Sequence, residues 1–213
     1  MTKKVLFACL AVLLLSCSRA EPRIPFGYIE LYYVPGDTLP EERFSFFVIA
    51  EDDDGFDNIT ELRLYHDREG LEWILSSDDW ITHEEDDKYW IGSRSIAMPE
   101  GQSLPRGQFR AVLFNSGGER TERLITFDAP EYPRYPNPSF RIENGNYSIN
   151  SQYPENSFIV YDLEGNIIEI LPLSLKEGSL ADFGITGTLI MYALWAQDEV
   201  ARTSFLTEAL PLR

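Results

Sequence analysis

Short apolar runs, rich in β-branched and aromatic residues, constrain the fold of this chain more than any other feature. Between residues 26 and 129 nearly every run is bounded by glycine, proline or acidic residues, which is typical of β-strands. In the run 59–65, Leu62 and Leu64 share one face and Glu61 lies on the other. We predict strands at Tyr28–Val34, Arg43–Ala50, Asn58–His66, Glu72–Ser76, Lys88–Ala97, Gln108–Asn115 and Glu122–Phe127. This pattern, without a convincing amphipathic helix, favours an all-β sandwich.

A proline-rich segment, residues 130–138, predicts an extended linker, because proline fixes its own φ and keeps its predecessor out of the helical region. The region 139–213 has the same strand style on a smaller scale, with hairpins expected at 141–149, 158–170 and 189–206. Only Ser174–Asp182 could hold a helical turn. We therefore predict two tandem Ig-like β-sandwiches, at 26–129 and 139–213.

Two segments carry a resemblance to known modules. Ala50–Ile59, followed by Glu61–Tyr65, resembles the acidic, glycine-containing turn between strands of bacterial Ig-like and fibronectin type III-like domains. Val160–Ile168 is similar to the strand-turn-strand of FlgD-like and secretion-associated Ig-like modules. Both resemblances imply a fold and say little about a function.

The amino terminus has the layout of a secretion signal. Lys3 and Lys4 precede the apolar run Val5–Leu15, which is too short to span about 30 Å of hydrocarbon as a stable helix. Ser16-Cys17 follows, and this order resembles the lipobox of bacterial, spirochaete-like lipoproteins. The resemblance implies that residues 1–16 are a signal peptide, that Cys17 is lipidated with fatty acyl chains, and that residues 17–25 form a short stalk. An ordinary secretory signal, or an uncleaved anchor, remains the alternative.

Cysteine usage and charge limit the protein's environment and partners. Of two cysteines, Cys9 leaves with the signal, so the mature chain cannot form an internal disulfide and depends on a packed core. Loss of Lys3 and Lys4 changes the formal charge from −17 to −19, which excludes nucleic acid as a partner. Ser18 follows Cys17, where enteric lipoproteins retained at the inner membrane have aspartate. We expect a lipid-anchored envelope protein, at the outer rather than the inner membrane.

The acidic loop 51–58 is a candidate calcium site. Carboxylates around a glycine turn can converge on a hard cation, and Asp52, Asp54 and Asp57 are the candidate ligands. The spacing is not that of an EF-hand, because Phe56 occupies a ligand position. A solvated loop with local turn hydrogen bonds is the alternative. We expect no other cofactor.

A second acidic segment, residues 78–87, is interpreted as a loop beside aromatic residues. Trp80 and Trp90 could stack on sugar rings, with Trp80 expected to be the more exposed. The alternative is that the tryptophans belong to the core. Loops 51–57 and 78–87 are both candidate contact surfaces.

Catalytic motifs are missing from the sequence. The two histidines, His66 and His83, lack metal-ligand spacing, and Gly-x-Ser-x-Gly is absent. We expect a membrane-tethered binding or scaffolding module that is not an enzyme, with an envelope protein or a glycan as partner. The alternative is a carbohydrate-binding or carbohydrate-active envelope protein that uses residues 78–90.

Overall fold

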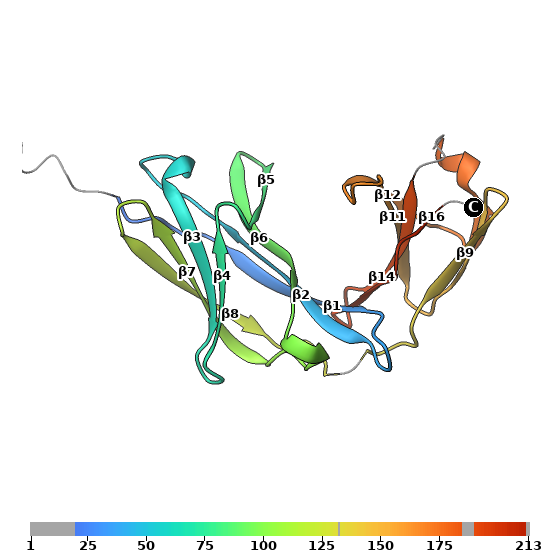
Figure 1. The fold of residues 1–213 in the computed structure, drawn as a ribbon, viewed down its shortest axis with the longest axis horizontal. Coiled ribbons are helices and arrows are strands. Elements are labelled where there is room, and N and C mark those ends of the chain that lie inside the picture. The colour runs from blue at the N-terminus through green and yellow to red at the C-terminus, as the bar shows by residue number, and fades with distance from the viewer. Residues whose placement is uncertain (1–19, 132, 185–189, 212–213) are drawn as a thin grey trace, which may run out of the picture. The chain divides into compact units, whose positions relative to one another are not determined.

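The structure is a computed structural model that describes residues 20–131, 133–184 and 190–211 (Figure 1). The strands are β1 (Gly27–Val34), β2 (Glu41–Ile49), β3 (Ile59–His66), β4 (Leu71–Ser76), β5 (Ile81–Glu85), β6 (Lys88–Ile96), β7 (Gly107–Asn115), β8 (Arg120–Phe127), β9 (Ser139–Glu143), β10 (Asn146–Asn150), β11 (Glu155–Tyr161), β12 (Ile167–Pro172), β13 (Glu177–Ser179), β14 (Met191–Asp198), β15 (Thr203–Leu206) and β16 (Leu210–Pro211). Helical structure in the described residues is confined to the 3₁₀ turns η1 (Phe56–Asn58), η2 (Pro99–Gly101) and η3 (Leu180–Phe183). The predicted all-β class is confirmed.

By the density of its contacts, the chain divides into two compact units. Unit 1 contains the described part of Met1–Tyr28 with Phe47–Ser93 and Gln108–Ile125, and unit 2 contains Ile29–Phe46, Arg94–Gly107 and the remainder from Thr126. The largest sheet has the strand order β12-β11-β14-β15-β1-β2-β6-β5, with β16 paired to β14. The predicted division at residues 130–138 falls within unit 2 and stays a prediction.

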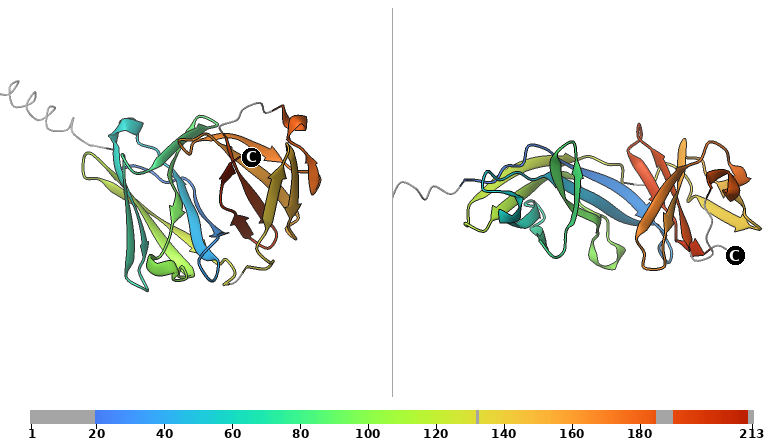
Figure 2. Two further views of the ribbon diagram at one scale, coloured as in Figure 1. Left: turned by 45° about the vertical axis from the view of Figure 1, so that its right-hand side comes forward. Right: turned by 90° about the horizontal axis from the view of Figure 1, so that it is seen from above.

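In unit 1, the sheet β4-β3-β7-β8 forms one layer of the fold (Figure 2). Alternation along β3 buries Leu62 and Leu64, as the sequence predicted. Gly27 of β1 shows how closely the opposite layer approaches, because a Cβ there would lie 2.9 Å from Ile125 Cδ1 of β8. The layers therefore enclose a tightly packed core at this point.

In unit 2, the sheet β13-β10-β9 packs against β11, β12 and β14 (Figures 1 and 2). The core between them contains Tyr147, Ile149, Phe158, Val160, Leu171, Leu180, Tyr192 and Leu194. The expected hairpins occur as β9–β10, β11–β12 and β14–β15. Only the end of the segment 174–182 is helical: β13 occupies Glu177–Ser179, and the 3₁₀ turn η3 begins at Leu180.

The segment 78–87 is not the loop that the sequence suggested. Residues 81–85 form β5, which pairs antiparallel with β6 from Ile81↔Gly92 to Glu85↔Lys88. Asp86 and Asp87 close this hairpin with φ of 50° and 58°. Two consecutive left-handed residues are what a tight hairpin turn requires, and aspartate tolerates that conformation better than most residues. The interpretation as a loop was wrong because acidic content concealed the β-propensity of Ile81-Thr82-His83.

Part of the expected stalk lies against unit 1. Pro22 and Ile24 are buried, and Arg23 forms an isolated antiparallel bridge with Glu51. Their backbones exchange hydrogen bonds of 2.7 and 3.0 Å. From Ala20, the first described residue, the segment is therefore in contact with unit 1.

A buried ion pair lies beside Pro130, where the proline-rich segment of unit 2 begins. Arg106 Nη2 lies 2.7 Å from Glu42 Oε1, and the two side chains are 19% and 5% exposed. The same guanidinium donates to the carbonyl oxygens of Ala129 and Pro130, at 2.9 and 2.7 Å. Glu42 also accepts the backbone N–H of Leu104. The charges are thus satisfied on both sides, which is the condition for burying such a pair.

Candidate functional site

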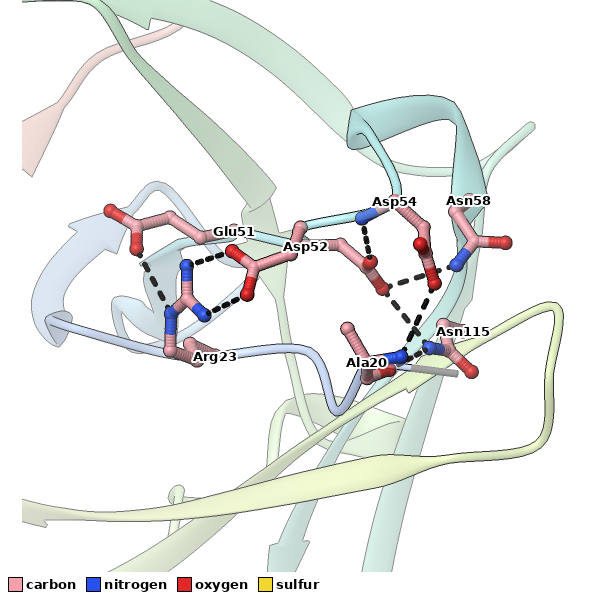
Figure 3. Close-up of polar contacts among 8 residues, drawn as sticks. Ala20, Arg23, Glu51, Asp52, Asp54, Asn58 and Asn115 are labelled. Carbon is pink, nitrogen blue, oxygen red and sulfur yellow. Dashed lines mark hydrogen bonds and ion pairs between the residues drawn. The ribbon is translucent and has the colours of Figure 1, made fainter. Parts of the chain in front are cut away.

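Loop 51–58 gathers a polar network at one end of β3 (Figure 3). Asp52 lies at its centre. Its Oδ1 accepts the backbone N–H of Asp54 at 2.8 Å, and its Oδ2 accepts the amides of Asn58 and Asn115 at 3.2 and 3.0 Å. Gly55, at φ 106° and ψ 153°, supplies the backbone conformation that only glycine adopts readily. The loop is therefore organised around its own N–H donors.

Asn115 links this loop to the chain's amino terminus. The residue is 3% exposed, and its Nδ2 donates to the Ala20 carbonyl at 2.9 Å as well as to Asp52. Its Oδ1 accepts the backbone N–H groups of Gly117 and Glu119, both at 3.0 Å. One buried amide thus connects the β7–β8 turn, loop 51–58 and Ala20. Ala20 is held a second time, because its N–H donates to Asp54 Oδ2 at 3.2 Å.

Arg23 holds the same segment through charge (Figure 3). Its Nη1 and Nη2 donate to the two carboxylate oxygens of Asp53 at 3.0 and 2.7 Å, and its Nε lies 3.4 Å from Glu51 Oε2. This hydrogen-bonded pair lowers the pKa of Asp53 and raises that of Arg23. Both side chains face solvent, so water and salt screen their attraction. We call Ala20 and Arg23, with their partners, the amino-terminal clamp.

The structure places the calcium candidates in different roles. Asp52 and Asp54 accept N–H groups within the clamp, whereas Asp57 is exposed in η1. Across the described residues, no group of three or more His, Cys, Asp or Glu side chains is arranged to hold a metal ion. The calcium site stays a prediction. The local alternative, a loop with turn hydrogen bonds, matches the contacts of Asp52.

Trp90 lies within a cluster of aromatic rings. His83 stacks parallel to it at 5.9 Å between centroids and 2° between planes, and Phe26 and Tyr28 meet it at 5.9 and 5.7 Å. The cluster covers Phe47, which is only 2% exposed although it points away from the sandwich core. Because one face of Trp90 is stacked on His83 and its edges contact two more rings, we assign it a packing role.

Trp80 is half-buried, as Trp90 is, so the expectation that Trp80 is the more exposed of the two stays a prediction. It lies in the turn before β5, and its backbone N–H donates to the Ser76 carbonyl at 3.1 Å. The proposed sugar-binding role of Trp80 and Trp90 stays a prediction.

The third sequence-predicted site, Cys17, lies outside the described residues. In the part of the chain that is described, no helix is long and apolar enough to cross a membrane. The residues that sequence reasoning missed are Arg23 and Asn115. The turn Asn115-Ser-Gly-Gly was recognisable as a hairpin turn, but its partners lie far away in the sequence.

No protein-family model matches the chain, and no curated protein matches it. Among solved structures, it is similar to Tp47, the 47-kilodalton lipoprotein of Treponema pallidum, with a TM-score of 0.36 and 11% identity over 83% of this chain and 48% of that one. Dimeric latent PorU from Porphyromonas gingivalis follows at 0.32 and 13%, over 90% and 20%. Dpr11 IG1 bound to DIP-gamma IG+IG2 gives 0.27 and 10%, over 88% and 99%. The chain thus spans less than half of Tp47 and a fifth of PorU. Its β-sandwich fold rests on its own strand pairing and core.

Proposed function

We propose that this protein is a bacterial envelope lipoprotein, anchored through acyl chains on Cys17, whose β-sandwiches serve as a binding or scaffolding module. The observation that carries the proposal is the amino-terminal order: Lys3-Lys4, the apolar run Val5–Leu15, then Ser16-Cys17. The layout is that of a cleaved signal, and it positions the cysteine at the cleavage point.

The folded part of the chain is compatible with this role. Rigid sandwiches present edges and loops for contact without requiring a catalytic pocket. Ala20 is hydrogen-bonded to unit 1 and lies three positions after Cys17, so a lipid on Cys17 would hold the unit close to a bilayer. A formal charge of −19 after cleavage favours solubility of the exposed surface and a partner other than nucleic acid. We place the protein at the outer membrane because Ser18, and not aspartate, follows Cys17.

The test is intact-mass spectrometry of the membrane fraction from native cells. We expect wild type and Cys9→Ala to lack residues 1–16 and to carry the same acyl adduct, since Cys9 lies within the removed peptide. Cys17→Ala is expected to lose both the adduct and membrane association. Wild-type protein without an acyl adduct, or Cys17→Ala with an unchanged one, would refute the proposal.

The partner is sought by cross-linking in the same cells, with deletion of residues 139–213 as the discriminating variant. A set of neighbours that depends on 139–213 would assign the binding surface to the second predicted sandwich. An unchanged set would assign it to the first. Absence of any neighbour beyond lipid and abundant envelope proteins would contradict the binding role.

A further inference from the structure

We infer that one end of unit 1, the acidic tip made of loop 51–58 and turn 115–119, is the surface that faces the lipid headgroups. This inference rests on the proposed anchor at Cys17. It adds what the anchor alone does not specify, namely which surface of the domain lies against the bilayer.

The chain between Cys17 and Ala20 is short. Cys17 and Ala20 are three positions apart, and an extended chain covers at most about 3.6 Å per residue. An acylated Cys17 lies at the headgroup boundary, so Ala20 is within about 11 Å of it. Whatever surface contacts Ala20 is therefore close to the bilayer.

The amino-terminal clamp fixes Ala20 to the acidic tip. Ala20 contacts Asp54 and Asn115 at 3.2 and 2.9 Å, which are in the two segments of the acidic tip. Three residues later, Arg23 pairs its backbone with Glu51 and its side chain with Asp53. The amino-terminal segment is thus held at two successive points before β1. This leaves no flexible stalk between Ala20 and the domain.

The charge of the acidic tip limits the kind of lipid headgroup it can face. The tip carries Glu51, Asp52, Asp53, Asp54, Asp57 and Glu119 against the single cation Arg23 of the clamp. At physiological ionic strength the Debye length is about 8 Å, similar to the reach of residues 17–20. The occupant that fits this surface is a hydrated, zwitterionic headgroup layer. An anionic layer would repel the tip, and apolar insertion is excluded by its carboxylates.

Probes at the two ends of β3 can show which end of unit 1 lies nearer the bilayer. Asp57 lies in η1 just before β3 and Arg68 lies just after it, and both are exposed. The eight residues of β3 separate them by about 26 Å at about 3.3 Å per residue. Protein 17–213, in which Cys17 is the only cysteine, is coupled to a maleimide lipid in phosphatidylcholine vesicles. A fluorescent amino acid at position 57 or 68 then reports energy transfer to an acceptor on the headgroups.

We expect clearly greater transfer from position 57 than from position 68. On vesicles with phosphatidylserine at low salt, transfer from position 57 is expected to fall and to recover when salt is added. Equal transfer from both positions, or greater transfer from position 68, would overturn the inference. Because the lipid is attached chemically, this outcome is independent of whether cells acylate Cys17, which the mass measurement decides.

Variants distinguish orientation of the domain by the clamp from simple attachment through the lipid tether. Arg23→Gln is expected to reduce the difference between the two positions. Arg110→Gln is the matched control, because Arg110 makes an equivalent two-point pair with Asp67 at 2.9 and 2.7 Å elsewhere in unit 1. If Arg23→Gln does not fold by circular dichroism, Asp53→Asn removes the same pair from the other side. An unchanged difference in a folded clamp variant would show that the clamp does not orient the domain.

Discussion

The two acidic segments of unit 1, loop 51–58 and hairpin 78–90, have similar compositions but different surroundings. In the loop, Asp52 accepts three N–H groups, and Asp53 pairs with Arg23. In the hairpin, Glu84, Glu85, Asp86 and Asp87 are exposed, and the order comes from β-pairing and from rings around Trp90. In these two segments, acidic residues thus have a structural role where buried amides or a cation converge on them.

The largest expected effect lies in the aromatic cluster of the hairpin. Trp90→Ala removes contacts with three rings and uncovers Phe47, so we expect a loss of about 3 kcal/mol in the free energy of unfolding. Trp80→Ala, the control, should cost less than about 1 kcal/mol, because within the described residues Trp80 makes no such ring contact. Urea denaturation measures both. Retained glycan binding by a folded Trp90→Ala, with loss in Trp80→Ala, would restore the carbohydrate interpretation for Trp80.

The next effect is in the loop. Asn115→Ala removes four hydrogen bonds of one buried side chain, to Asp52, to the Ala20 carbonyl and to two backbone N–H groups of the β7–β8 turn, and we expect it to cost about 2 kcal/mol. The hairpin counterpart is Asp79→Ala, which removes an exposed carboxylate that accepts from Ser76 and should change stability by at most about 0.5 kcal/mol. Equal losses from the two variants would remove the distinction between the segments.

Relief of backbone strain in the hairpin should have a smaller effect, which raises the free energy of unfolding instead of lowering it. Loop 51–58 has Gly55 where its backbone needs glycine, but the hairpin has Asp86 and Asp87 at φ of 50° and 58°. Replacing them by Asn and Gly, the residues that this turn favours, should stabilise unit 1 by about 0.5–1 kcal/mol. Thermal denaturation measures the gain. A lower Tm would mean that the side chains of Asp86 and Asp87 stabilise the turn by more than their positive φ destabilises it.

The sequence predicted most of the fold because burial follows local alternation, as at Leu62 and Leu64 in β3. It failed for β5, where exposed acidic residues concealed an edge strand. The clamp was not predictable either, because Arg23 and Asp53 are 30 positions apart and no local period connects them. Asn115 was recognisable only as a turn residue, since its role depends on Ala20 and Asp52 being brought to it by the folded chain.

Acid should weaken the clamp through protonation of Asp53. The pKa of Asp53 is lowered below its ordinary 3.8 by the Arg23 pair, so the stabilisation is present above pH 3.8 and is lost as pH falls through the lower, folded-state value. We expect the ¹⁵N heteronuclear NOE of residues 20–23 to decrease in that range in wild type. Arg23→Gln should show lower values than wild type already at pH 7, with little further change as pH falls. Identical pH profiles in both proteins would mean that the ion pair does not hold the segment.

Calcium removal is expected to have the smallest effect on loop 51–58. The oxygens of Asp52 already accept three N–H groups, and Asp54 accepts the N–H of Ala20, so bound calcium would have to compete with these donors. We therefore expect the Tm in calcium to equal the Tm in chelator, as it should for an Asp52→Asn control. A Tm that falls on chelation in wild type but not in Asp52→Asn would instead assign a calcium site to Asp52, Asp54 and Asp57, and the two acidic segments would then differ by a metal as well as by their hydrogen bonds.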